Sequence, residues 1–151
     1  MAAISQTIQK QSLLAQKLEA LGVGVLYLFG SRVRGVAREK SDYDLGVVFR
    51  CLETADVDLE LYNELYDVLN EIFPDMIDGP RLDISFLQNA NAALQMSAIR
   101  YGTVFYESDP VFRANYEESV LKKYDDYRFL QRQYEEATFS AFRKPRSIIH
   151  V

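Results

Sequence analysis

The chain has 151 residues, of which 48% are hydrophobic and 26% charged, and its formal net charge is −5. This length suits one domain with a hydrophobic core of its own, so we expect a single domain over residues 1–151. Non-specific binding to a nucleic-acid backbone depends on clustered Lys and Arg, which a net negative charge argues against. A binding site for a polyanion must therefore be local.

Cys51 and His150 are each the only residue of their type. One cysteine allows no intrachain disulfide and no cysteine-based zinc site, and a histidine this late in the chain is a poor candidate for a Ser-His-Asp triad. Polar side chains interrupt the segment 1–21, which lacks the apolar stretch of a signal peptide or membrane span. We therefore expect a cytoplasmic protein that does not contact a membrane.

In the first half of the chain, predicted helices and strands alternate. Apolar residues at helical spacing predict a helix over residues 6–21, which Gly22 and Gly24 should end. A short apolar run predicts a buried strand over 25–29, and a short helix can follow over 32–35. A second strand is expected over 42–49 and a helix over 56–73.

The second half continues the alternation with a strand over 81–87, a helix over 90–101 and a short strand over 103–107. A long helix is expected over 110–142, with Asp109 as its N-cap and Pro110 at its first position. This order predicts an α/β (α+β) protein with a small mixed sheet flanked by helices.

The most informative stretch is GSRVRGVAREKSDYD at residues 30–44. It places a Gly-Ser turn after one predicted strand and an Asp-x-Asp motif at the start of the next. Side chains two apart on a strand share a face, so Asp42 and Asp44 should project together. Neighbouring carboxylates repel unless a cation lies between them, and Mg²⁺ prefers carboxylate and phosphate oxygens. Two such ions, about 3.5–4 Å apart, can hold the attacking and leaving oxygens of a phosphoryl displacement.

The Gly-Ser turn is the expected binding element for the phosphates. Gly30 permits close backbone approach, and Ser31 offers a hydroxyl and a backbone N–H. A helix beginning here would add partial positive charge. Three arginines that follow, Arg32, Arg34 and Arg38, can neutralise a triphosphate in an otherwise acidic chain.

Asp83 is the expected third carboxylate. It is the one acid in the apolar strand pattern over 81–87, where burial of an unpaired carboxylate would be costly. Metal ligation, or a role as general base toward an attacking hydroxyl, would account for it there. The acidic cluster of Asp56, Asp58 and Glu60 is the alternative source of a third acid, although its pattern is that of a helix start.

The Gly-Ser turn, the ten residues after it and the Asp-x-Asp motif resemble the signature of the DNA-polymerase-β-like nucleotidyltransferase superfamily. In its short length the chain resembles the minimal nucleotidyltransferases (MNT), in particular the MntA antitoxins paired with HEPN-family toxins. The resemblance extends over roughly residues 20–140, and its specific motifs lie in 30–44.

This resemblance implies a nucleotidyltransferase fold with Asp42, Asp44 and Asp83 as catalytic metal ligands. It also places Gly30 and Ser31 at the triphosphate. It implies ATP as the substrate and two Mg²⁺ ions as the cofactor. The implied reaction is transfer of AMP to a tyrosine of a HEPN-type RNase toxin. The chain would then be an antitoxin in a hetero-oligomer and a protein adenylyltransferase.

Other interpretations of the same residues stay open. Asp42 and Asp44 can cap a turn, Asp83 can form an ion pair with Arg81 or Arg100, and the three arginines can be solvated loop charges. The chain can also be an antitoxin that acts by steric binding without needed catalysis. A further alternative is a nucleotidyltransferase for a small, antibiotic-type compound.

Aromatic residues are unusually frequent in the predicted C-terminal helix. They exceed what one helix face usually buries in a small domain: Tyr116, Tyr124, Tyr127, Phe129 and Tyr134. Because aromatic residues are enriched at interfaces, we expect part of the helix over 110–142 to dock a protein partner. A second group of aromatic residues is expected in the core instead: Tyr62, Tyr66, Phe105, Tyr106 and Phe112.

Overall fold

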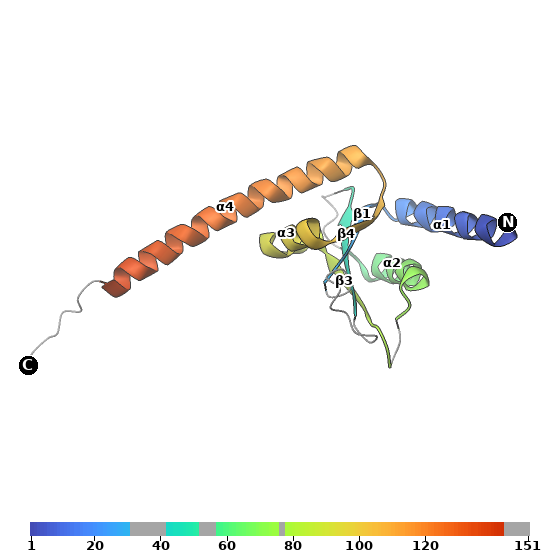
Figure 1. Ribbon diagram of the computed structural model, residues 1–151, viewed down its shortest axis with the longest axis horizontal. Coiled ribbons are helices and arrows are strands. Elements are labelled where there is room, and N and C mark those ends of the chain that lie inside the picture. Colours follow the sequence, from blue (N-terminus) through green and yellow to red (C-terminus); the bar gives the residue numbers. More distant parts are fainter. Residues whose placement is uncertain (31–41, 52–56, 76–77, 144–151) are drawn as a thin grey trace, which may run out of the picture.

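The computed structural model describes residues 1–30, 42–51, 57–75 and 78–143. The elements follow one another in this order: α1 (Ala2–Ala20), β1 (Val23–Phe29), β2 (Tyr43–Phe49), α2 (Leu59–Ile72), β3 (Leu82–Phe86), η1 (Leu87–Asn89), α3 (Ala92–Tyr101), β4 (Thr103–Glu107) and α4 (Pro110–Arg143) (Figure 1). The predicted fold class is confirmed. The short helix expected over 32–35 lies outside the described residues.

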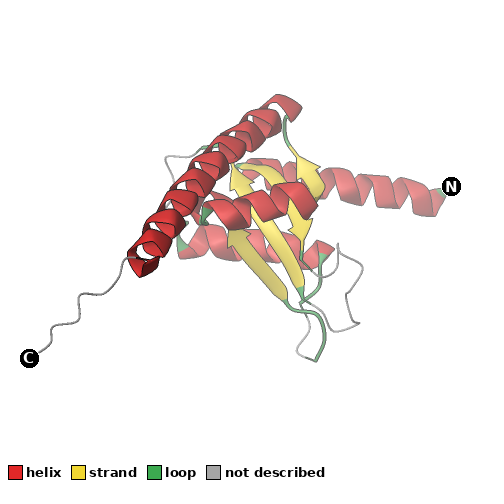
Figure 2. Ribbon diagram, turned by 60° about the vertical axis from the view of Figure 1, so that its left-hand side comes forward, coloured by secondary structure: helices red, strands yellow, loops and turns green. Residues whose placement is uncertain are grey.

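The strands form one mixed sheet in the order β3-β2-β1-β4. β1 pairs antiparallel with β2 and with β4, whereas β2 and β3 are parallel. Helices α1 and α2 cover one face and α3 and the first part of α4 cover the other (Figure 2). Because side chains alternate along a strand, β2 supplies residues to both cores. Leu45 and Val47 pack on the α1 and α2 side, and Val48 packs on the α3 and α4 side.

The end of α1 differs from the prediction. Gly22 turns the chain with a φ of 81°, but Gly24 does not end the helix, because it lies inside β1. A Cβ at Gly24 would meet the ring of Phe112, which packs against the strand there. The glycine therefore allows α4 to approach the sheet, a tertiary reason that the local sequence does not reveal.

α2 begins later than residue 56, because Asp58 is its N-cap and accepts a hydrogen bond from the backbone N–H of Leu61 at 2.8 Å. This agrees with the reading of the acidic cluster as a helix start. Among the aromatic residues expected in the core, Tyr62 and Phe105 lie at its margin: they are 36% and 47% exposed, and their rings contact those of Phe86 and Phe73. Phe105 lies at the register irregularity between β1 and β4, where Leu26 pairs with Tyr106 and Tyr27 with Val104.

The N-terminal turns of α4 are fixed to the sheet by polar contacts. Asp109 accepts a hydrogen bond from the backbone of Val111 at 3.0 Å, as expected for a cap. The hydroxyl of Tyr27 donates to Glu117 Oε1 at 2.8 Å. Burial, together with Glu117, raises the pKa of Tyr27, so its phenol stays protonated and remains a donor.

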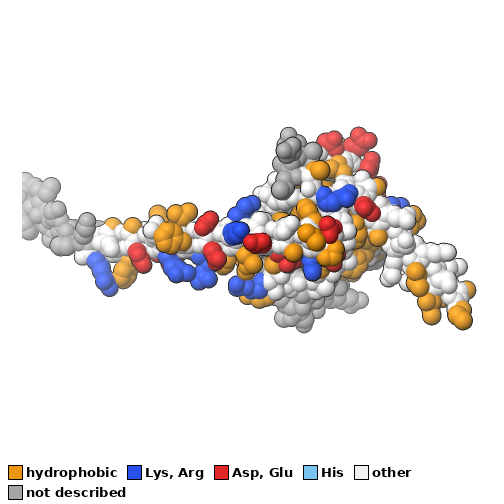
Figure 3. Space-filling model, turned by 90° about the horizontal axis from the view of Figure 1, so that it is seen from above, with side chains coloured by type: hydrophobic (Ala, Val, Ile, Leu, Met, Phe, Trp, Pro, Cys, Tyr) orange, Lys and Arg blue, Asp and Glu red, His pale blue; other side chains and the backbone are white. Residues whose placement is uncertain are grey.

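Beyond these turns α4 extends away from the domain, and the N-terminal half of α1 projects in the opposite direction (Figure 1). The space-filling view shows hydrophobic side chains on both projecting helices (Figure 3). In the part of the chain that the structure describes, no helix combines the length and apolar character needed to cross a membrane.

Candidate active site

Two of the predicted catalytic acids lie side by side at one end of the sheet. In the parallel β2–β3 pair, Asp44 is the register partner of Asp83, and on the other side of β2, Asp44 is paired with Phe29 at the end of β1. Tyr43 and Leu45 belong to the core under α1 and α2, so Asp44 faces the other side of the sheet, the side of α3.

Gly30 lies directly against this pair. Its φ is 83°, a conformation that L side chains rarely adopt, and a Cβ there would overlap Asp44 Oδ2. The sequence predicted that Gly30 lets a phosphate approach closely. In the structure the group that approaches it is the carboxylate of Asp44, which occupies the space that a side chain at position 30 would fill.

The three acids interact electrostatically. The pKa of Asp44 is raised, first by burial, then by the negative charges of Asp83 and Asp42, and by a hydrogen bond with Asp83. Burial and two neighbouring negative charges both disfavour the ionised form of Asp44. The cluster therefore destabilises its own fully ionised form.

Asp83 is exposed, which corrects the expectation of a buried acid. β3 is an edge strand of the sheet, and the side chain of Asp83 on it is open to solvent. The cost of burying a carboxylate is therefore no argument that Asp83 binds a metal. The argument is its position opposite Asp44 in the β2–β3 register.

Asp42 has a structural contact as well as an exposed carboxylate. Its Oδ1 accepts a hydrogen bond from the backbone N–H of Arg81 at 3.1 Å, and the N–H of Tyr43 donates to the carbonyl of Arg81 at 2.8 Å. These contacts join the start of β2 to the residue just before β3. The interpretation of Asp42 as a backbone cap thus has support, although the capped residue, Arg81, is far away in the sequence and directly precedes β3.

The side chain of Arg81 is fixed from the opposite side. Arg81 Nε lies 2.8 Å from Asp75 Oδ1, and Asp75 Oδ2 accepts a hydrogen bond from the hydroxyl of Tyr66 at 2.6 Å. Arg81 is thus paired with Asp75, contrary to the alternative that it pairs with Asp83. The other candidate, Arg100, lies over the ring of Tyr101 at 6.0 Å. Sequence reasoning missed this network, because no spacing or motif connects Tyr66 and Asp75 to Asp42.

Carboxylate oxygens are the ligands that Mg²⁺ prefers. A cation at this cluster would oppose the repulsion that raises the pKa of Asp44, so the donor set and its electrostatics fit a divalent metal. As the side chains stand, no three or more His, Cys, Asp or Glu residues of the described ranges are arranged to hold a metal ion. Metal ligation by Asp42, Asp44 and Asp83 therefore stays a prediction.

Most of the predicted triphosphate loop lies outside the described residues. This applies to Ser31, Arg32, Arg34 and Arg38. Their assignment to nucleotide binding rests on the sequence alone. Gly30, the first residue of that loop, is described and adjoins Asp44.

The sequence profile of the family described as "Polymerase beta, Nucleotidyltransferase" matches residues 11–111, which is more than half of the chain. The chain belongs to this family. The match includes Gly30, the Asp-x-Asp motif and Asp83, and confirms the resemblance inferred from the sequence. None of the curated proteins searched matches the chain.

Solved structures of toxin–antitoxin complexes contain chains with a similar fold. A toxin–antitoxin structure with AMP-PNP has a TM-score of 0.55 and 19% identity, over 85% of this chain and 98% of that chain. A mutant of the toxin–antitoxin MntA-HpeT has a TM-score of 0.56 and 16% identity, over 87% and 97%. A tri-AMPylated Shewanella oneidensis HEPN toxin in complex with MNT antitoxin has 0.50 and 19%, over 87% and 98%. At these identities the similarity establishes the fold.

Proposed function

We propose that the chain is a Mg²⁺-dependent protein adenylyltransferase that transfers AMP from ATP to a tyrosine of a HEPN-type toxin and so acts as its antitoxin. The observation that carries the proposal is the pairing of Asp44 with Asp83 beside Gly30 in a chain of the nucleotidyltransferase family. Support for the substrate and partner comes from the similar structures, one with AMP-PNP and one with an AMPylated HEPN toxin.

In this proposal Asp42, Asp44 and Asp83 hold the metal. Bound Mg²⁺ supplies positive charge for the carboxylates and for the phosphate oxygens of the nucleotide. Gly30 leaves room for the carboxylate of Asp44, because a Cβ at position 30 would displace it. The contact between Asp42 and the backbone of Arg81 keeps the start of β3 beside β2.

The transfer exchanges one phosphorus–oxygen bond for another. The tyrosine oxygen of the toxin forms a bond to the α-phosphorus of ATP, and the bond from that phosphorus to the leaving pyrophosphate breaks. Asp83 is the expected acceptor for the hydroxyl proton, since it is the exposed member of the pair on the edge strand. Ser31, Arg32, Arg34 and Arg38 are expected to bind the triphosphate.

The direct test uses ATP labelled at the α-phosphate in one reaction and at the γ-phosphate in another. With a HEPN-type toxin and Mg²⁺, the α-label should appear in the toxin and the γ-label should not. Labelling from both would indicate phosphoryl transfer, and labelling from neither would contradict the proposal. A small amino alcohol offered as acceptor in a parallel reaction tests the antibiotic-type alternative.

The distal half of α4 is the proposed docking surface for the toxin. It carries large apolar side chains that are between 46% and 77% exposed: Tyr127, Phe129, Leu130, Tyr134, Phe139 and Phe142. Exposed large apolar side chains in this number are typical of interaction sites. The anchoring contact of Glu117 with Tyr27 lies earlier in the helix, so deletion of the residues after Tyr127 should leave the domain folded and abolish co-purification with the toxin.

The same surface favours a second candidate function, neutralisation by steric binding. If contact alone silences the toxin, the Asp42→Asn/Asp44→Asn variant should neutralise it as well as the wild type does. If AMP transfer is needed, that variant should bind the toxin and fail to neutralise it. Growth of cells that express the toxin with either variant separates the two mechanisms.

A further inference from the structure

The first helix has an apolar stripe that its own domain covers only in part. Positions 1, 4, 8, 11, 15 and 18 follow the alternating spacing of three and four that defines the contact face of paired helices, and they are Met1, Ile4, Ile8, Gln11, Ala15 and Leu18. Leu18 is buried in the core, whereas Ile8 and Ile4 are 59% and 66% exposed. The stripe therefore continues beyond the domain without a cover.

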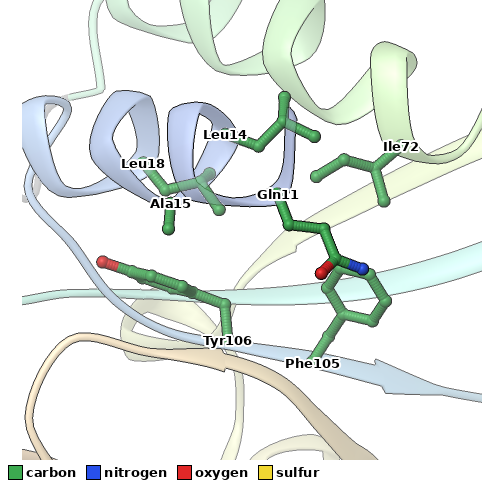
Figure 4. Close-up of a pocket in the computed structure, with 7 residues that line it drawn as sticks. All are labelled: Gln11, Leu14, Ala15, Leu18, Ile72, Phe105 and Tyr106. Atoms are coloured by element: carbon green, nitrogen blue, oxygen red, sulfur yellow. The ribbon is translucent and has the colours of Figure 1, made fainter. Parts of the chain in front are cut away.

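A groove lies where the stripe leaves the sheet. Its volume is about 510 Å³ and it is bounded by α1, by Ile72 at the end of α2, and by Phe105 and Tyr106 of β4 (Figure 4). Gln11 and Ala15 of the stripe line it, and the side chains around it are mainly apolar. The helix thus carries exposed apolar side chains and, one to two turns later on the same face, a hollow in which such side chains fit.

We propose that a second copy of this chain fills the groove, through antiparallel pairing of the two α1 helices about a two-fold axis. When position 4 of one helix lies opposite position 15 of the other, position 8 lies opposite position 11, and the same contacts recur on the other side of the axis. Ile4 of each copy then enters the groove of the other at Ala15. A face that is complementary to itself in this way is the requirement for a two-fold interface.

The polar and charged groups of α1 agree with self-association. In this register the two Gln11 side chains lie on either side of the axis, about 4.5 Å apart along the helices, where their amides can hydrogen-bond to each other. Residues 1–18 contain two charged side chains, Lys10 and Lys17; both lie outside the stripe, and Lys17 is paired with Glu71. The contact face itself therefore carries no charged side chain, and antiparallel alignment places opposite helix dipole ends together.

The first test measures mass by light scattering over a concentration series. The wild type should be a dimer at micromolar concentration, and Ile8→Lys should weaken association by about a hundredfold or more, because each interface would bury a charge without a partner. Leu13→Lys is the matched control, since Leu13 is also on α1 and is 51% exposed but lies opposite the stripe. A wild-type monomer at 100 µM, or an equal effect of both variants, would overturn the proposal.

The second test fixes the register by disulfide formation in a Cys51→Ser background. A mixture of Ile4→Cys and Ala15→Cys chains with different tags should form a mixed disulfide under oxidation. Ile4→Cys alone should not cross-link, because its copy lies about 16 Å away along the axis, and a disulfide needs Cα atoms within about 7 Å. Self-linking of Ile4→Cys would show parallel pairing instead. A dimer that forms only when a toxin is present would assign the groove to the toxin. Self-linking of Ile4→Cys and toxin-dependent dimerisation would each reject the proposal.

Discussion

The acidic end of the sheet and the two projecting helices are built by different means. At the acidic cluster, backbone pairing sets Asp44 opposite Asp83, and the carboxylate of Asp44 lies against Gly30. On the free halves of α1 and α4, large apolar side chains such as Ile4 and Phe142 are 66% and 77% exposed. The comparison suggests that chemistry is located where the fold restricts side chains, and recognition where it leaves them uncovered.

The largest effect is expected at the cluster itself. Asp42→Asn/Asp44→Asn should reduce AMP transfer by about a thousandfold or more, because it removes the charges proposed to hold Mg²⁺. The variant should stay folded, since it removes repulsion. Asp126→Asn on exposed α4 is the control and should transfer at the wild-type rate. Near wild-type transfer by the double variant would refute the metal assignment.

Gly30→Ala, compared with Gly22→Ala, separates the effect of the contact with Asp44 from the effect of the positive φ. We expect a loss of about 1–3 kcal/mol in the free energy of unfolding and a strong loss of transfer, because the new methyl group displaces Asp44. Gly22→Ala is the control: it has a similar positive φ, yet a Cβ there meets nothing within 4 Å. Gly22→Ala should lower the free energy of unfolding only through the unfavourable φ, by about 1–2 kcal/mol. Equal transfer by both variants would show that the contact between Gly30 and Asp44 has no functional role.

The supporting network should have a smaller effect on the site. Asp75→Asn weakens the contact with Arg81, whose backbone holds Asp42, and we expect about a tenfold loss of transfer or of apparent Mg²⁺ affinity. Glu71→Gln, which breaks an exposed ion pair with Lys17 in the same region, should leave both unchanged. A Mg²⁺ titration of the transfer rate compares the two. No change with Asp75→Asn would mean that the network only stabilises the fold.

The raised pKa of Asp44 predicts how stability depends on pH in the absence of divalent metal. Its folded pKa lies above the ordinary value of 3.8, so the protonated form stabilises the folded state below that value. This contribution is lost as the pH rises through the raised folded pKa. Asp44→Asn should remove this decline in stability. Mg²⁺ should raise the Tm of the wild type mainly at pH values above the folded pKa of Asp44. Thermal melts from pH 3 to 8, with and without Mg²⁺, test this; identical profiles for the two proteins would contradict it.

The smallest effect on stability is expected on the projecting half of α4. Phe129→Asp should change the free energy of unfolding by less than about 0.5 kcal/mol, because Phe129 is 60% exposed, yet it should abolish co-purification with the toxin. Val111→Asp, on the same helix and 64% exposed, should retain the partner. Retention by both variants would place the toxin elsewhere.

The sequence predicted helices and strands well where the local pattern of apolar residues was clear. Apolar runs located the strands, and helical spacing together with Asp109 located α4. It also placed Asp44 in a strand, whereas Asp42, expected at the start of that strand, directly precedes it. These features are local, so a single sequence contains the information.

The rest depends on which distant segments meet. The pairing of Asp44 with Asp83 follows from the parallel β2–β3 register, which no local pattern specifies. The apolar residues around Asp83 predict a buried strand, but Asp83 is exposed on the edge strand β3. The local sequence predicts that Gly24 ends a helix, whereas the ring of Phe112 explains why a glycine is needed in β1.

The parallel pairing of β2 and β3 has a consequence for biosynthesis. Parallel neighbours need a crossover connection, here the segment that contains α2, so the third acid reaches the sheet only after that segment has folded back. A nascent polypeptide that has not yet emerged past β3 contains the first two acids without their companion. Any chemistry that needs all three acids must therefore wait until β3 has been synthesised and has paired with β2.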